Sequence, residues 1–221
     1  MSEFEATFFD MDGVTVETAH VWRDVEETHV LPEAVESSEV DGTAIRGLGV
    51  SDAYERLASM DGVDLAVDRE EFGRLYHDRV EEVYRERARL LPGYHDVLSD
   101  LDAAGHRVGL VSASQRAWVE HVLDRFDLHE AFDVVVGADD VPGPSKPAPD
   151  CYEQAAHTVG VDPERALAVE DSPHGIEAAT SAGMYCLALR GSGNADLDLS
   201  LADDILDGPE ELRETIRRLV S

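Results

Sequence analysis

The chain has 221 residues, of which 43% are hydrophobic, and this is enough for one sizeable core or for a core domain that carries an insertion. Asp and Glu number 48 against 18 Lys and Arg, which gives a formal net charge of −30 and a sequence pI of about 4.4. Electrostatic repulsion at this charge excludes nucleic acids and anionic membranes as expected partners.

Short apolar runs alternate with helical patterns along most of the chain. Each run is short enough to be a buried strand, and the alternation predicts an α/β fold with a Rossmann-like, doubly wound parallel sheet. The expected strands are 6–9, 107–111, 132–136, 166–169 and 184–189. The expected helices of this core are 95–104, 117–126, 150–159, 175–182 and 209–219, the last of which follows an acidic stretch at 196–207.

One long stretch, residues 17–90, interrupts this alternation after the first strand. It contains amphipathic helical patterns at 21–29, 50–59 and 69–89 and no convincing strand. We therefore expect an inserted α-helical domain at 17–90 and a core domain made of residues 1–16 and 91–221.

The first polar motif follows the first expected strand. Asp10 and Asp12 lie at the carboxyl edge of the sheet, where ligands of such folds bind. One carboxylate of such a pair can attack a phosphorus atom while the other handles a proton. Gly13 lets the backbone turn, so that N–H groups of Met11 and Gly13 can face a phosphate. Taken alone, the motif is equally compatible with an ordinary acidic turn or part of a calcium loop.

Two further segments carry groups suited to holding a phosphate. Ser112 follows the second expected strand and can donate its hydroxyl, with the Ala113 N–H beside it. Lys146 precedes the helix at 150–159 and is the only lysine in the sequence. A compact ammonium between a carboxylate and a phosphate is poorly replaced by a planar guanidinium, so its retention here indicates a specific role.

A pair of acids, Glu170 and Asp171, ends the fourth expected strand. Carboxylate oxygens suit Mg²⁺, which takes one or two protein carboxylates together with water and substrate oxygens. Together with Asp10, these two residues are candidate metal ligands. As an isolated pair they are more typical of a helix N-cap and its neighbour than of a metal site.

The order of Asp10, Asp12, Ser112, Lys146 and Glu170-Asp171 resembles the four motifs of the haloacid dehalogenase superfamily over almost the whole chain. The helical insertion resembles that superfamily's first type of cap domain. The resemblance implies that Asp10 forms an aspartyl-phosphate and that Asp12 is general acid and then base. It also implies that Lys146 and Ser112 hold the phosphoryl group. Mg²⁺ is the implied cofactor, with Asp10, Asp171 and the carbonyl oxygen of Asp12 as its ligands.

Within this superfamily the sequence favours a phosphatase that hydrolyses a small phosphate monoester, either a sugar phosphate or a phosphoglycolate-like ester. The pattern of 2-haloacid dehalogenases lacks the second Asp of the first motif, and Asp12 is present. A β-phosphoglucomutase-type mutase is the main alternative: Arg46 fits its basic cap residue, but Val50 stands where an arginine is expected and Trp22 where a histidine is expected. A binding module without activity has no need for both Asp10 and Asp12.

Other features bear on specificity and setting. His20, Trp22, Arg23 and Arg46 are candidates for substrate specificity, with helix packing as an equal alternative. We expect Cys151 and Cys186 to be reduced core residues. The start of the sequence does not resemble a leader, and there is no long apolar run, so we expect a cytoplasmic protein. We also expect a monomer or a homodimer. The acidity and the use of arginine in place of lysine resemble proteins of halophilic archaea.

Overall fold

The computed structural model describes residues 3–36, 40–45, 48–143 and 145–220. The chain divides into two compact units, one formed by Met1–Glu17 with Arg89–Ser221 and the other by Thr18–Ala88. The boundaries expected from the sequence, 16/17 and 90/91, differ from these by one and two residues.

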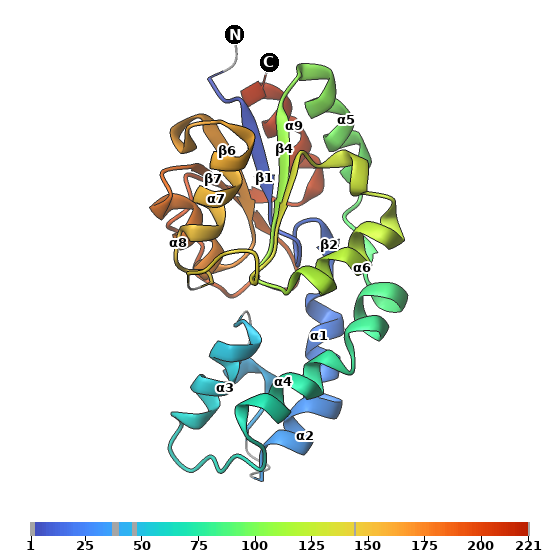
Figure 1. Ribbon diagram of the computed structural model, residues 1–221, viewed down its shortest axis with the longest axis vertical. Helices are drawn as coiled ribbons and strands as arrows, with labels where there is room; N and C mark the ends of the chain where they lie inside the picture. Colours follow the sequence, from blue (N-terminus) through green and yellow to red (C-terminus); the bar gives the residue numbers. More distant parts are fainter. Residues whose placement is uncertain (1–2, 37–39, 46–47, 144, 221) are drawn as a thin grey trace. The chain divides into compact units, whose positions relative to one another are not determined.

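The first unit is built on a parallel sheet (Figure 1). Within the described ranges it has six strands in the order β5-β4-β1-β6-β7-β8. In register, Phe9 of β1 lies between Leu110 of β4 and Val169 of β6, so the central strands end at the same edge. The strands are β1 (Ala6–Phe9), β4 (Arg107–Val111), β5 (Val134–Val136), β6 (Ala166–Glu170), β7 (Tyr185–Arg190) and β8 (Asp204–Asp207).

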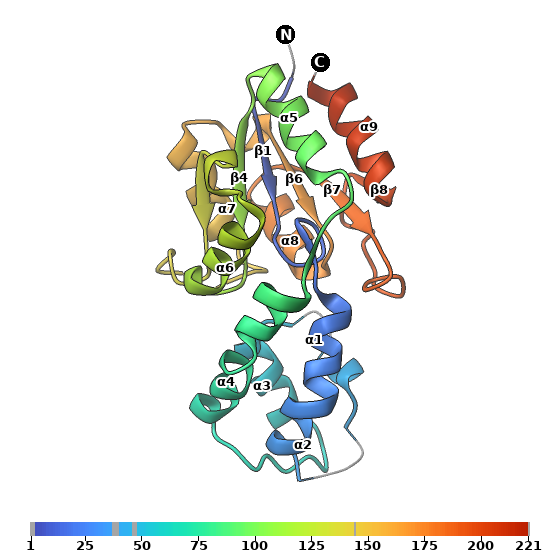
Figure 2. The same ribbon diagram turned by 90° about the vertical axis from the view of Figure 1, so that its right-hand side faces the viewer.

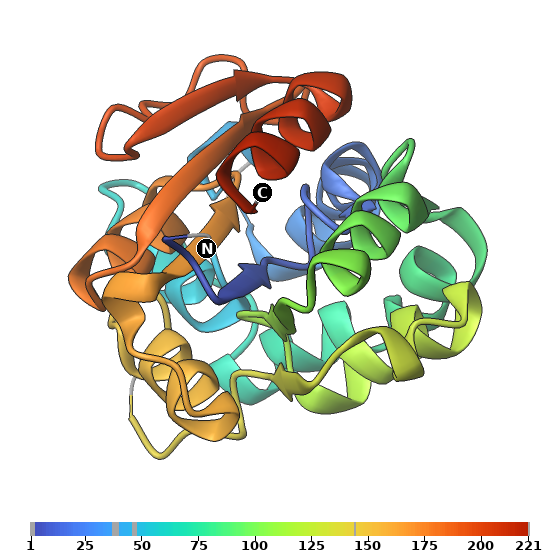
Figure 3. The same ribbon diagram turned by 90° about the horizontal axis from the view of Figure 1, so that it is seen from above.

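Helices cover both faces of this sheet. Figure 3 shows green α5 and red α9 on one side of the strands and the gold-to-orange α7 and α8 on the other, and Figure 2 shows α5 beside α9. The central strands of the sheet are buried on both faces, which explains why their sequences are mostly apolar. The prediction of an α/β core is confirmed. These helices are α5 (Tyr94–Ala104), α6 (Arg116–Phe126), α7 (Asp150–Val159), α8 (Pro173–Ser181) and α9 (Pro209–Val220).

Strand β8 lies within residues 196–207, where the sequence predicts an acidic stretch and no strand. It pairs in parallel with β7, so that Leu206 lies beside Leu189. Only Leu206 of its four residues is buried, and Ile205 is exposed. An edge strand with one buried side chain leaves little apolar signal in the sequence.

The second unit is helical, as expected for the insertion, but its last predicted helix is wrong in extent. The pattern at 69–89 forms two helical segments separated by a turn at residues 78–79, not one helix. The segments are α1 (Ala19–Val25), η1 (Glu26–Val30), α2 (Leu31–Ala34), η2 (Gly42–Ala44), α3 (Val50–Ala58), α4 (Arg69–His77) and η3 (Glu82–Arg87). In the first unit, short strands β2 (Val16–Glu17) and β3 (Arg89–Leu90) pair antiparallel.

Two further expectations concern the chain as a whole. Cys151 and Cys186 are both buried and unbridged, as expected. Among the described residues, none of the helices combines the length and the apolar character needed to span a bilayer.

Candidate active site

Asp10 directly follows β1 at the carboxyl edge of the sheet. Its N–H donates to the carbonyl oxygen of Val169 at 2.9 Å, which continues the pairing with β6 by one residue. The Thr15 hydroxyl donates to the Asp10 carbonyl oxygen at 2.8 Å and closes the loop that follows. Only 7% of Asp10 is exposed, so its side chain is almost inaccessible to solvent.

Lys146 contacts the Asp10 side chain. Its Nζ donates to Asp10 Oδ1 at 2.6 Å, to Glu170 Oε1 at 2.6 Å and to the Val111 carbonyl oxygen at 3.0 Å. The lysine side chain is 4% exposed and that of Glu170 is 0% exposed. A buried ion pair is compatible with folding only when the charges are close and hydrogen-bonded, and both conditions hold here.

The segment after β4 forms a small turn beside the first motif. The Ser112 N–H donates to the Val136 carbonyl oxygen, so the residue extends the pairing of β4 with β5. Its hydroxyl oxygen accepts the Ser114 N–H at 3.0 Å, and Ala113 lies between the two serines at the turn. The Ser114 hydroxyl donates to Asp12 Oδ2 at 3.3 Å. The structure therefore brings Ser112 and Asp12 to the same edge of the sheet.

Gly13 has a different environment from the one expected. Its N–H donates to the Val16 carbonyl oxygen at 2.8 Å and is therefore engaged within the loop. Its φ is +89°, and a Cβ there would lie 2.0 Å from Asp171 Oδ2. Its contribution is space for the Asp171 carboxylate rather than a donor to phosphate. Met11 has a buried side chain, and its carbonyl oxygen accepts the N–H groups of Thr15 and Val16.

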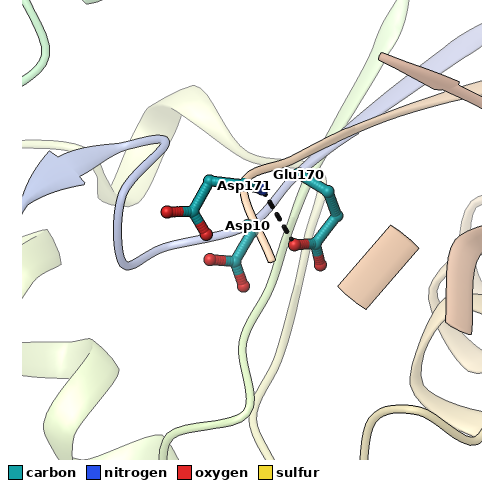
Figure 4. Close-up of side chains that lie close together, drawn as sticks. All are labelled: Asp10, Glu170 and Asp171. Atoms are coloured by element: carbon teal, nitrogen blue, oxygen red, sulfur yellow. Dashed lines mark hydrogen bonds between the residues drawn. The ribbon is translucent and has the colours of Figure 1, made fainter. Parts of the chain in front are cut away.

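Three acids converge at this edge (Figure 4). Asp10, Glu170 and Asp171 can each offer one oxygen such that all three atoms lie within 4.8 Å of one another. Burial, with further repulsion from Asp10 and Glu170, raises the pKa of Asp171 well above its usual range. Burial also raises the pKa of Asp10 to about 7, because Lys146 offsets it only in part. Such a cluster favours binding of a divalent cation, which would relieve the repulsion.

Sequence reasoning missed several residues that hold this cluster. Tyr152, in the first turn of α7, donates its hydroxyl to Glu170 Oε1 at 2.8 Å. Asn194 Nδ2 donates to the carbonyl oxygens of Asp171 at 2.7 Å and Leu189 at 2.9 Å. Asn194 is the only asparagine in the sequence, so the scarcity argument that singled out Lys146 applies to it as well. Nothing in the local pattern around Thr15 indicates its bond to Asp10.

The candidate specificity residues belong to the second unit. His20 is exposed on α1, and Arg23 is partly buried there. Trp22 packs within the unit against the rings of Tyr76 and Tyr84, and its Nε1 donates to the Tyr84 hydroxyl at 3.3 Å. These contacts make Trp22 part of the unit's packing. Arg46 lies outside the described residues.

Comparison with known proteins extends the interpretation of this site. The model of the haloacid dehalogenase-like hydrolase family matches residues 4–183. Hexitol phosphatase B of Escherichia coli K12 is 31% identical over 197 residues, covering 83% of this chain and 82% of the relative. A Thermotoga maritima protein named phosphorylated carbohydrates phosphatase is 29% identical over 180 residues, with coverage of 81% and 82%.

A solved structure shows the same architecture. CbbY from Rhodobacter sphaeroides, in complex with phosphate, matches with a TM-score of 0.79 at 28% identity, covering 93% of this chain and 94% of that one. This chain belongs to the haloacid dehalogenase-like hydrolase family. Its named relatives confirm the prediction of an enzyme of the phosphatase class.

Proposed function

We propose that this protein is a Mg²⁺-dependent phosphatase that hydrolyses a small phosphorylated carbohydrate through an aspartyl-phosphate on Asp10. The observation that carries the proposal is the buried contact of Asp10 Oδ1 with Lys146 Nζ at 2.6 Å, at the edge where Asp12, Ser112 and Asp171 also gather. A nucleophile, a cation and a second acid at one sheet edge are what phosphoryl transfer requires.

In the first step a carboxylate oxygen of Asp10 attacks phosphorus, and the bond from phosphorus to the ester oxygen breaks. Asp12 gives its proton to that oxygen, so the alcohol leaves neutral. In the second step Asp12 takes a proton from water, whose oxygen attacks the phosphorus of the acyl phosphate. Inorganic phosphate leaves and the Asp10 carboxylate is restored. Lys146 and the Ser112 hydroxyl stabilise charge on the phosphoryl oxygens.

The donor set fits Mg²⁺. Asp10 and Asp171 supply hard oxygens, and the Asp12 carbonyl oxygen is the third ligand that we assign. Both oxygens of Glu170 already accept hydrogen bonds, Oε1 from Lys146 and Oε2 from the Asp171 N–H at 3.2 Å, so we assign Glu170 mainly to holding Lys146. When bound, the cation supplies positive charge that draws a phosphate into an otherwise acidic site.

The relatives support a carbohydrate phosphate as the substrate class. Two curated relatives are named for hexitol and for phosphorylated carbohydrates. CbbY has been solved with xylulose-1,5-bisphosphate bound, at 28% identity and a TM-score of 0.80. Solved structures described as β-phosphoglucomutases are 23% and 24% identical, so they support the shared fold and not a mutase activity.

A screen of phosphate esters tests the proposal. We expect phosphate release from sugar and polyol phosphates and from p-nitrophenyl phosphate with Mg²⁺ in molar KCl, chosen because the charge and lysine scarcity suggest a halophilic setting. Asp10→Asn should abolish release, while Asp162→Asn, at an exposed site outside the cluster, should leave it unchanged. An active Asp10→Asn variant, or a wild type that releases no phosphate from any ester, would contradict the proposal. β-Glucose 1-phosphate converted to an isomer would favour the mutase.

A further inference from the structure

Tyr152 lies directly under the proposed phosphate-binding lysine. It is the third residue of α7 and is fully buried. Its hydroxyl donates to Glu170 Oε1 at 2.8 Å, and the same oxygen accepts Lys146 Nζ at 2.6 Å. The Nζ also lies 5.1 Å from the centre of the Tyr152 ring, within the range of a cation–π contact. One side chain thus contacts both members of the ion pair.

The hydrogen bonds of Lys146 show why its anchoring matters. An ammonium has three protons, and the acceptors Asp10 Oδ1, Glu170 Oε1 and the Val111 carbonyl oxygen account for all three. To bind a phosphoryl oxygen, Lys146 has to exchange one of these bonds. Asp10 is the acceptor that reacts, so its bond is the one exchanged. Glu170 and Val111 must then hold the ammonium in place.

Glu170 is itself held on several sides. Its Oε2 accepts from the Asp171 N–H at 3.2 Å and from the Ser172 hydroxyl at 3.4 Å. A Cβ at Gly175 would lie 2.0 Å from the Glu170 carboxyl group, so the backbone at the start of α8 packs directly against this carboxylate. Tyr152 supplies the hydroxyl donor to Oε1, the oxygen that faces Lys146.

We propose that Tyr152 is a positioning residue that keeps Lys146 in place beside the reacting groups during phosphoryl transfer, through its hydroxyl on Glu170 and its ring beneath the ammonium. The role rests on the proposed phosphatase function and adds a residue outside its four motifs. Without the hydroxyl, Oε1 keeps only the Lys146 donor in a site closed to water, and the carboxylate can rotate. Without the ring, the Lys146 ammonium also loses its cation–π contact.

Kinetics of two variants separate these contributions. Tyr152→Phe keeps the ring, and we expect kcat to fall about 5- to 20-fold with KM within twofold, because the defect is in the transition state. Tyr152→Leu removes both contacts and should lose more. Tyr185→Phe is the matched control, since the Tyr185 hydroxyl also donates to a carboxylate, Asp204, at 3.1 Å. It should retain wild-type kcat.

The single lysine provides a readout that does not depend on turnover. In protein labelled with [15Nζ]-lysine, Lys146 gives the only lysine side-chain signal in the NMR spectrum. We expect this signal to shift and its protons to exchange at least fivefold faster with water in Tyr152→Phe but not in Tyr185→Phe. Phe and Leu variants with equal activity would overturn the role of the ring. An unmoved signal with unchanged kcat in Tyr152→Phe would overturn the positioning role.

The two failures are distinguishable. If the wild-type protein has no phosphatase activity, the proposed function is wrong, whatever the NMR signal of Lys146 shows. If the wild type is active but Tyr152→Phe changes neither the Lys146 signal nor kcat, the phosphatase function stands and Tyr152 has no positioning role.

Discussion

Lys146 donates to three acceptors that lie in different directions around a nearly unexposed side chain. Burial opposes its charge, but Asp10 and Glu170 outweigh that effect and raise its pKa, so the ammonium is charged throughout the physiological range. A tetrahedral ammonium can satisfy this arrangement, whereas a planar guanidinium directs its donors in one plane and is larger.

We therefore expect Lys146→Arg to reduce kcat by roughly 100-fold or more, the scale of losing one donor to a developing charge. Initial rates with saturating Mg²⁺ would measure this. Arg165→Lys, which changes an exposed pair with Glu5, serves as the control and should keep full activity. A fully active Lys146→Arg enzyme would contradict the specific role inferred from the scarcity of lysine.

The raised pKa of Asp10 predicts that the free energy of unfolding of the metal-free protein depends on pH. Its pKa is raised to about 7 in the folded state against about 3.9 in the unfolded chain. A raised folded-state pKa means that the folded protein binds the proton more tightly. The stabilisation is complete below about pH 3.9 and is lost as pH rises through about 7.

In EDTA, the Tm of wild type relative to Asp10→Asn should therefore decline between about pH 5 and 7.5, the upper part of that window. Comparing the two pH profiles by calorimetry removes the effect of the carboxylates that lie away from Asp10, which titrate alike in both proteins. Parallel profiles would show that Asp10 does not titrate in this range.

The candidate site was predictable from the sequence where a residue ends a strand. Parallel strands bring their carboxyl ends together, so Asp10, Ser112 and Asp171 were expected to meet. The supporting residues were not, because Tyr152 occupies the apolar face of a helix and its bond to Glu170 depends on tertiary packing. Gly13 was assigned a donor role because the sequence does not reveal which carbonyl its N–H meets.

Asn194, which is 2% exposed, links the loop after β7 to the site. Besides its two bonds from Nδ2, its Oδ1 accepts the Gly191 N–H at 2.7 Å. Arg190 Nη1 adds bonds to backbone carbonyl oxygens of the same loop, including that of Ala195 at 3.2 Å. The loop therefore fixes the backbone of Asp171 from outside the motif.

Asn194→Ala leaves two carbonyl groups and one N–H without this partner. We expect the free energy of unfolding to fall by roughly 2–4 kcal/mol, since each buried unsatisfied group costs about 1–3 kcal/mol. Thermal denaturation would measure it, and the rise in Tm on adding Mg²⁺ should shrink because Asp171 is less well placed. Gln154→Ala, an exposed amide on α7, is the control. Unchanged stability in Asn194→Ala would contradict the assigned bonds.

The elements themselves were predicted best where they are buried. Strands β1, β4 and β6 lie in the centre of the sheet, and their apolar runs identified them to within a residue at either end. Strand β8 was missed because an edge strand needs only one buried face. The turn at 78–79 was missed because the amphipathic pattern continues across it, and the sequence there has no glycine or proline.

Two electrostatic effects of salt on the stability of the folded protein oppose each other. Helices α5 and α9 are joined by ion pairs, in which Arg213 and Arg217 contact Asp100 at 2.9 and 2.8 Å and Arg213 also contacts Asp96 at 2.7 Å. Salt weakens such partly exposed pairs. Salt also screens the mutual repulsion of a chain with a net charge of −30. The excess of carboxylates is large enough for the second effect to dominate.

We therefore expect the Tm to rise between 0.1 and 2 M KCl by roughly 10 °C, equivalent to about 3–5 kcal/mol for a chain of this size. Most of the rise should occur below about 1 M, where the Debye length has already shortened from about 10 to about 3 Å, and NaCl should act similarly if screening is the cause. Asp100→Ala should lower the Tm more in 0.1 M than in 2 M KCl, because it removes pairs that salt already weakens. A Tm that is flat or falls with KCl would show that the ion pairs, not the net charge, govern the stability of this protein.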